Sequence, residues 1–139
     1  NFQQLNSMSE VLSGVKDKNG KIGFWDRNGV ELTPFQFDYV QHLRNDQYVV
    51  KMNEKMGVYS EKGVLLIPVE FDEITPWLNG KYYMVQRGAK KGIFTKTGVE
   101  LLPQEYDLIK EFVVGCWMLK KESQLLYFFP DSKRVITYN

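Results

Sequence analysis

The sequence predicts an all-β domain built from tandem repeats, and three observations support this prediction. The 139 residues contain a single Ala (Ala89) but 14 Val, 8 Tyr and 9 Phe, a composition that disfavours helices and suits half-buried strands. Glycines, often preceded by Asn, recur at the spacing expected of tight hairpin turns. The same order of residue types returns every 34–35 positions, and a fixed period of this length is typical of solenoids, propellers and other arrays.

Three repeats align at the segments Lys21-Ile22-Gly23, Lys55-Met56-Gly57 and Lys90-Lys91-Gly92. After each of these glycines, a second glycine, a proline and an aromatic-Asp pair follow in the same order. The structural anchors of the repeat are Gly23, Gly57, Gly92, Gly29, Gly63, Gly98, Pro34, Pro68, Pro103, Asp38, Asp72 and Asp107. We therefore predict a single repeat domain over residues 1–139, with whole repeats at 21–54, 55–89 and 90–123 and partial repeats at 1–20 and 124–139.

Within one repeat, the turn residues predict an antiparallel meander of three short strands. In the middle copy these strands cover residues 48–52, 56–60 and 64–67, with turns at 53–54 and 61–63. We expect Pro68 to close the third strand, where its missing N–H costs no ladder hydrogen bond. Residues 71–77 alternate less strictly and are expected to form a turn or loop that packs an aromatic side chain inward.

The partial repeats at the two ends leave two arrangements open. Together with the three whole repeats they amount to about four periods of 34–35 residues. We expect an open or curved array, because units of three short strands make weak propeller blades. The alternative is a closed, propeller-like ring in which the two partial repeats meet.

The anchors resemble those of the WG-containing repeat family, whose unit runs Gly-Lys-Trp-Gly-aromatic-Ile-Asp, then a glycine turn, an apolar run, Ile-Pro and an aromatic-Asp pair. The resemblance covers residues 21–112 well and the two ends weakly. The namesake Trp is replaced here by Ile22, Met56 and Lys91. The resemblance implies a bacterial β-rich scaffold without a known catalytic centre, of a kind frequent in envelope-associated or secreted proteins; no other feature indicates a compartment.

Charge and composition exclude several classes of partner. With 18 Lys and Arg against 17 Asp and Glu, the formal net charge is +1, so the basic excess that nucleic acid or an anionic membrane surface requires is missing. No stretch approaches the apolar length of a membrane span, and we expect no membrane insertion. The single cysteine, Cys116, excludes an internal disulfide and a multi-thiolate zinc site. It lies in the apolar, strand-like run 113–119 and is expected to be buried and inert.

The recurring aspartates and the single histidine are the candidates for metal binding and catalysis. Stacked Asp38, Asp72 and Asp107 could form a Ca²⁺ ladder, but one carboxylate per repeat supplies too few of the 6–8 oxygens that Ca²⁺ prefers. We expect each Asp to cap a turn by accepting local backbone N–H groups, with no metal and no cofactor bound. His42 has Pro76 and Glu111 as its repeat counterparts, so the position does not carry the same chemistry in each copy. We predict that the protein is not an enzyme, and a hydrolase that uses His42 is a distant alternative.

Aromatic residues are the remaining candidates for ligand contacts, because exposed rings stack on sugars and anchor protein interfaces. Trp25 aligns with Tyr59 and Phe94, a column expected to pack in the seam between units. Trp77 aligns with apolar residues and is also expected in a seam. The binding candidates are Tyr39, Trp77, Tyr82 and Tyr83.

Three functions follow from these observations, in order of preference. The first is a non-catalytic scaffold that binds another macromolecule, a protein or a glycan, because repeats present extended surfaces on which residues between the anchors are free to vary. The second is a purely structural spacer within a longer repeat array. The hydrolase that uses His42 comes last. The sequence does not indicate an oligomeric state.

Overall fold

The computed structural model describes residues 3–7 and 12–138, which form strands, turns and irregular segments. Within these ranges, no helix is long and apolar enough to cross a membrane. The strands are β1 (Gln3–Ser7), β2 (Leu12–Lys16), β3 (Ile22–Asp26), β4 (Tyr39–His42), β5 (Tyr48–Met52), β6 (Lys55–Tyr59), β7 (Leu65–Phe71), β8 (Glu73–Trp77), β9 (Tyr82–Arg87), β10 (Lys90–Thr95), β11 (Glu100–Tyr106), β12 (Leu108–Val113), β13 (Cys116–Lys121), β14 (Gln124–Phe129) and β15 (Arg134–Tyr138).

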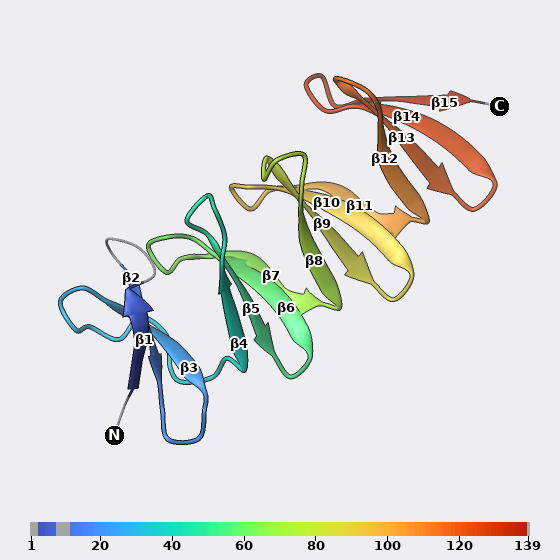
Figure 1. Ribbon diagram of the computed structural model, residues 1–139. Coiled ribbons are helices and arrows are strands. Elements are labelled where there is room, and N and C mark those ends of the chain that lie inside the picture. Colours follow the sequence, from blue (N-terminus) through green and yellow to red (C-terminus); the bar gives the residue numbers. More distant parts are fainter. Residues whose placement is uncertain (1–2, 8–11, 139) are drawn as a thin grey trace. The chain divides into compact units, whose positions relative to one another are not determined.

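The strands form four antiparallel sheets, each a meander of strands that are consecutive in the chain (Figure 1). The first sheet holds β1–β3, the second β4–β7, the third β8–β11 and the fourth β12–β15. The predicted all-β tandem-repeat fold is confirmed. Strands from the two ends of the chain belong to different sheets, as expected for an open array, because a ring closed by its termini would combine them in one sheet.

The predicted three-stranded meander is present, but a fourth strand extends it. The strands expected at 48–52, 56–60 and 64–67 correspond to β5, β6 and β7, and β4 pairs with β5 on its other side. The loop expected over 71–77 is wrong, because residues 73–77 form β8. This strand lies at the edge of its sheet, where it carries Pro76 and an exposed Thr75. An edge position tolerates both residues. Their presence interrupts the alternation of apolar and polar residues by which a strand is recognised in the sequence.

The second, third and fourth sheets each begin directly after one of the recurring aspartates. Asp38 precedes β4, Asp72 precedes β8 and Asp107 precedes β12. The sequence repeat at 55–89 therefore holds β6 and β7 of the second sheet followed by β8 and β9 of the third. Every whole repeat contributes strands to two consecutive sheets, so the repeat seen in the sequence and the sheet seen in space are out of phase.

The first glycine of each repeat lies against the backbone of the following segment, which is a strand in the second and third repeats. A Cβ atom on Gly57 would stand 2.7 Å from the Ile67 carbonyl oxygen, and one on Gly92 would stand 2.6 Å from the carbonyl oxygen of Leu102. At the same place the register of β7 shifts, because Met56 pairs with Phe71 whereas Val58 pairs with Ile67. Pro68 lies inside this irregular edge strand and does not close it as expected. Glycine is required here because the bulged backbone occupies the space of a side chain.

The chain divides into two compact units, unit 1 (Asn1–Ile74) and unit 2 (Thr75–Asn139). In each unit the apolar core lies between consecutive sheets, as expected of a seam between repeats. The core of unit 1 includes Ile22, Phe24 and Phe37 packed with Tyr48, Val50 and Tyr59. The core of unit 2 includes Ile93 and Leu102 packed with Ile109, Trp117, Leu119, Leu126 and Phe128.

Candidate binding site

In unit 1, Asp38 links the two sheets between which it stands. One carboxylate oxygen accepts a hydrogen bond from the Lys21 ammonium group, and the other accepts one from the backbone N–H of Asn53 at 3.1 Å. The backbone N–H of Asp38 donates to the carbonyl oxygen of Lys51 at 2.8 Å. Lys21 precedes β3 of the first sheet, whereas Lys51 and Asn53 belong to the second. We call this arrangement of a Lys, an Asp and a backbone N–H a clasp.

Unit 2 contains the same clasp. The Lys90 ammonium nitrogen lies 2.5 Å from Asp107 Oδ1, and the backbone N–H of Glu122 donates to Asp107 Oδ2 at 2.8 Å. At the remaining junction, Lys55 pairs with Asp72. The expected carboxylate–backbone bond is thus present at Asp38 and Asp107, but its donor lies 15 residues further along the chain and not in a local turn.

The clasp also explains the electrostatics of these aspartates. Lys21, followed by the N–H of Asn53, holds the pKa of Asp38 below its usual range. Lys90, followed by the N–H of Glu122, lowers the pKa of Asp107 in the same way. Both carboxylates therefore have protein partners that favour the ionised form. In residues 3–7 and 12–138, no three His, Cys, Asp or Glu side chains gather as a metal site would require.

His42 lies at the end of β4, beside the turn that leads to β5. Its Nε2 atom is 2.8 Å from Asp46 Oδ1, and its ring stacks on that of Tyr48 with centroids 4.9 Å apart. The histidine is therefore held by residues of its own turn. Cys116, at the start of β13, is buried as predicted.

The structure brings together two of the four aromatic binding candidates. Trp77 and Tyr82, on β8 and β9 of the third sheet, lie with ring centroids 6.3 Å apart. Tyr39 belongs to β4 in unit 1 and is 51% exposed. Tyr83 has no exposed surface and is enclosed in the core, so its side chain contacts the protein interior and not the surface.

Trp117 of the fourth sheet completes the cluster in unit 2. Its ring lies 4.8 Å from that of Trp77 and 4.8 Å from that of Tyr82, both edge to face. Edge-to-face contacts between large rings fix their orientation and stabilise the packing. Trp117 is only 1% exposed, whereas Tyr82 and Trp77 are half-buried. The cluster thus forms a rigid base that reaches the surface at Tyr82.

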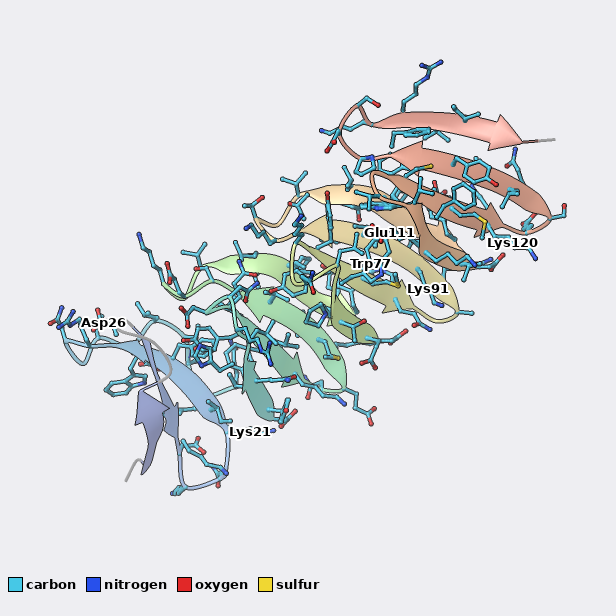
Figure 2. All side chains as sticks on the ribbon, turned by 45° about the horizontal axis from the view of Figure 1, so that its top comes forward. Lys21, Asp26, Trp77, Lys91, Glu111 and Lys120 are labelled. Carbon is cyan, nitrogen blue, oxygen red and sulfur yellow. The ribbon has the colours of Figure 1, made fainter. Side chains whose placement is uncertain are left out.

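A pocket of about 340 Å³ adjoins this cluster. Figure 2 labels Trp77 and Glu111, which lie in this part of unit 2. The lining comes from the third and fourth sheets and from the turns β8–β9, β12–β13 and β14–β15. It consists of Leu78, Asn79, Lys81, Tyr82, Glu111, Val114, Gly115, Trp117, Pro130 and Asp131.

Three charged side chains line the pocket: Lys81, Glu111 and Asp131. All three are exposed. Glu111 pairs across the strands with Trp117, so its side chain lies on the same face of the fourth sheet as the indole. Across the described part of the chain, no ion-pair partner lies within 4.0 Å of any of the three. Their charges are available to a ligand.

The end of β12 and the turn to β13 present exposed apolar side chains, of which Val114 lines the pocket. Phe112, Val113 and Val114 are 57%, 54% and 93% exposed, and we call these three residues the 112–114 tip. The Phe112 ring packs against Tyr127 with centroids 5.2 Å apart. The expectation that 113–119 forms one apolar strand is wrong, because Val113 pairs with Cys116 across a two-residue turn. Gly115 adopts a φ of +84°, and a glycine inside an apolar run is the sequence feature that indicates this turn.

Comparisons with known proteins bear on the family. Residues 22–55 and 56–90 each match the family model described as WG containing repeat. No curated protein matches the chain. Among solved structures, the chain is similar to one described as "Crystal structure of HIRA(644-1017)", with 14% identity and a TM-score of 0.41 over 98% of this chain and 48% of that one. This chain therefore spans about half the length of that structure's chain. The two consecutive repeat matches show that the chain belongs to the WG containing repeat family.

Proposed function

We propose that this chain is a non-catalytic binding domain, and that the pocket of unit 2 together with the 112–114 tip is its ligand site. The observation that carries the proposal is the exposure of three consecutive apolar side chains, of which Val114 lines a pocket together with Tyr82 and Trp117. Single exposed apolar residues are ordinary on protein surfaces, whereas contiguous apolar groups beside a concave site with polar edges are typical of interaction sites.

The scaffold supports this division of roles. The clasps link consecutive sheets, and the close-packed glycines allow neighbouring strands to approach within a sheet, so the turns between strands are free to differ from copy to copy. Val113 pairs with Cys116 through its backbone and Val114 lies in the turn, so the sheet pairing requires neither valine side chain. The proposal includes the bacterial, envelope-associated or secreted setting that the family resemblance implies, and detection of the protein in cell fractions tests that part.

The experiment compares three versions of the chain in a binding screen. Wild type, Val114→Asp and Val64→Asp are each tested against a glycan array and a displayed peptide library. Val64 is also an exposed valine next to a turn glycine, but it lies in unit 1. Each of the two substitutions adds one carboxylate to the surface, so the two variants have the same net charge. We expect the ligands that wild type selects to bind the Val64→Asp variant as well and not to bind the Val114→Asp variant.

Two outcomes would contradict the proposal. If wild type selects no glycan and no peptide, the chain is better described as a structural spacer. If selected ligands bind Val114→Asp as well as wild type, the domain binds through another surface. Circular dichroism of both variants checks that neither substitution changes the fold.

A further inference from the structure

We infer that the ligand of this site is a peptide segment that places one cationic side chain, Lys or Arg, in the pocket and an apolar neighbour against the 112–114 tip. This inference rests on the proposed function and names the chemistry of its ligand. It follows from the charge of the lining, from the aromatic ring within it and from the apolar character of the adjoining turn.

The lining has an excess of negative charge. Glu111 and Asp131 contribute two carboxylates and Lys81 contributes one ammonium group, so one negative charge remains unbalanced. No ion-pair partner within 4.0 Å neutralises these groups in the described residues. A ligand with one positive charge would complete the balance, and charge complementarity of this kind selects partners and their orientation.

Tyr82 provides a second reason to expect a cation. Its half-buried ring lines the same pocket as the two carboxylates and is held at 88° to the Trp117 indole, with centroids 4.8 Å apart. A tyrosine ring attracts an ammonium or guanidinium group placed over its face, because the face carries the negative part of the ring quadrupole. Because the ring is already fixed by Trp117, little conformational entropy is lost when a cation binds.

The 112–114 tip favours a peptide over a glycan. Phe112 packs against Tyr127, on the face of the fourth sheet opposite to Trp117 and the pocket. On the pocket side, Val113 and Val114 are aliphatic, so they offer neither a flat ring for a sugar face nor a hydrogen-bonding group for its hydroxyls. A cationic side chain next to an apolar one is a combination that a peptide supplies on adjacent residues. Binding would cover Val114, the most exposed of the large apolar side chains described.

The test titrates the whole chain with three capped peptides, acetyl-Gly-Leu-X-Leu-Gly-amide, in which X is Arg, Lys or norleucine. Norleucine keeps the length of the lysine stem and removes the charge. Chemical-shift changes of the indole N–H groups report binding near Trp117. We expect the Arg and Lys peptides to bind saturably and the norleucine peptide to bind about tenfold more weakly.

Charge variants of the protein test the same inference from the other side. Glu111→Gln and Asp131→Asn are each expected to weaken binding of the Arg peptide. Lys81→Gln is expected to strengthen binding, because it removes the repulsion between two cations. Glu73→Gln removes an exposed carboxylate outside the pocket and serves as the matched control, with no change expected. Opposite effects of Lys81→Gln and Glu111→Gln cannot arise from a general loss of stability.

The outcomes separate the inference from the proposed function. The inference of a cationic ligand is wrong if the norleucine peptide binds as tightly as the Arg peptide. It is also wrong if Glu111→Gln and Asp131→Asn leave the affinity for the Arg peptide unchanged. Should that binding still be lost in Val114→Asp, the proposed site stands with a different ligand chemistry. If none of the three peptides binds wild type, the peptide inference is overturned, and the glycan arm of the binding screen decides the proposed function alone.

Discussion

The β4–β5 turn of unit 1 and the β12–β13 turn of unit 2 occupy the same place in the repeat but differ in chemistry. Both follow a strand that begins directly after a clasp aspartate, and both lead into a buried aromatic residue, Tyr48 or Trp117. The first turn is polar, with Asp46 bonded to His42. The second carries the 112–114 tip, whose apolar side chains face solvent.

The difference shows which residues serve the fold and which are free for function. The flanking residues keep the same role in both copies, because the sheets pack through them. The residues at the turns make ring contacts within their own sheet, His42 with Tyr48 and Phe112 with Tyr127. One copy can therefore satisfy its own polar groups while the other exposes apolar surface. Predictions about substitutions in the two copies therefore test whether this separation holds.

The largest loss of stability is expected at the buried aromatic residues that the two copies share. Trp117→Ala and Tyr48→Ala should each lower the free energy of unfolding by about 3–5 kcal/mol, because each removes a ring with almost no exposed surface. Urea denaturation followed by circular dichroism measures both losses, with Phe112→Ala as an exposed control. A loss below about 1 kcal/mol for either residue would contradict the claim that the two copies share this role, since the stability of that copy would then not depend on its buried aromatic ring.

The next largest loss is expected at the glycines that lie against a neighbouring strand. Gly57→Ala and Gly92→Ala should each cost about 3 kcal/mol, because the new Cβ would overlap a backbone carbonyl oxygen that cannot move alone. Gly29→Ala is the control, since nothing lies within 4 Å of its Cβ position although its φ is +83°. The control should cost about 1 kcal/mol. Equal losses for all three would show that turn geometry, not close approach, sets the requirement for glycine.

A smaller, pH-dependent loss is expected at the clasps. Because the pKa of Asp38 and of Asp107 is lowered in the folded protein, their contribution to stability is present above the unfolded value of about 3.9 and is lost as the pH falls through the folded value. Asp38→Asn and Asp107→Asn should therefore melt below wild type at pH 7 and approach it below about pH 4. Thermal melts across this range provide the measurement. A difference that persists unchanged at pH 2 would exclude the ionised clasp as its source.

The smallest effect on stability is expected at the tip. Val114→Asp should change the free energy of unfolding by no more than about 0.5 kcal/mol, because Val114 is 93% exposed. The same substitution is expected to abolish ligand binding. A large loss of stability would instead show that the tip takes part in packing, and the distinction between the two turns would fail.

The repeat and its anchors could be predicted from the sequence because identical residue types recur at a fixed spacing. The fourth strand could not, because β8 is an edge strand whose Pro76 and Thr75 hide the alternation of a sheet. The partners of Asp38 were missed for another reason. They lie 17 residues before and 15 residues after it, and only the pairing of consecutive sheets brings these positions together.

The candidate site shows the same limit. The sequence predicts Tyr82 and Trp77 as binding candidates because they carry aromatic rings, and the structure places the two rings near each other. Glu111 and Asp131 were not selected, because the pocket is assembled from turns of two sheets that are far apart in sequence. Recurrence along the chain identifies residues that do the same task in each repeat, whereas a site built once from several turns has no period.

The short sequence separation between the partners of each clasp affects how repeats can be added to such a chain. The Asp107 clasp uses Lys90 and the N–H of Glu122, so it closes within the single sequence repeat 90–123, although it links two consecutive sheets. A gene duplication that inserts one whole period would create a complete new clasp and leave the existing ones intact. Folding would proceed through short loop closures whatever the number of copies, because no essential contact grows longer as the array does. Chain length is thus free to vary in evolution by whole repeats, while an insertion of half a repeat would leave a lysine without its aspartate.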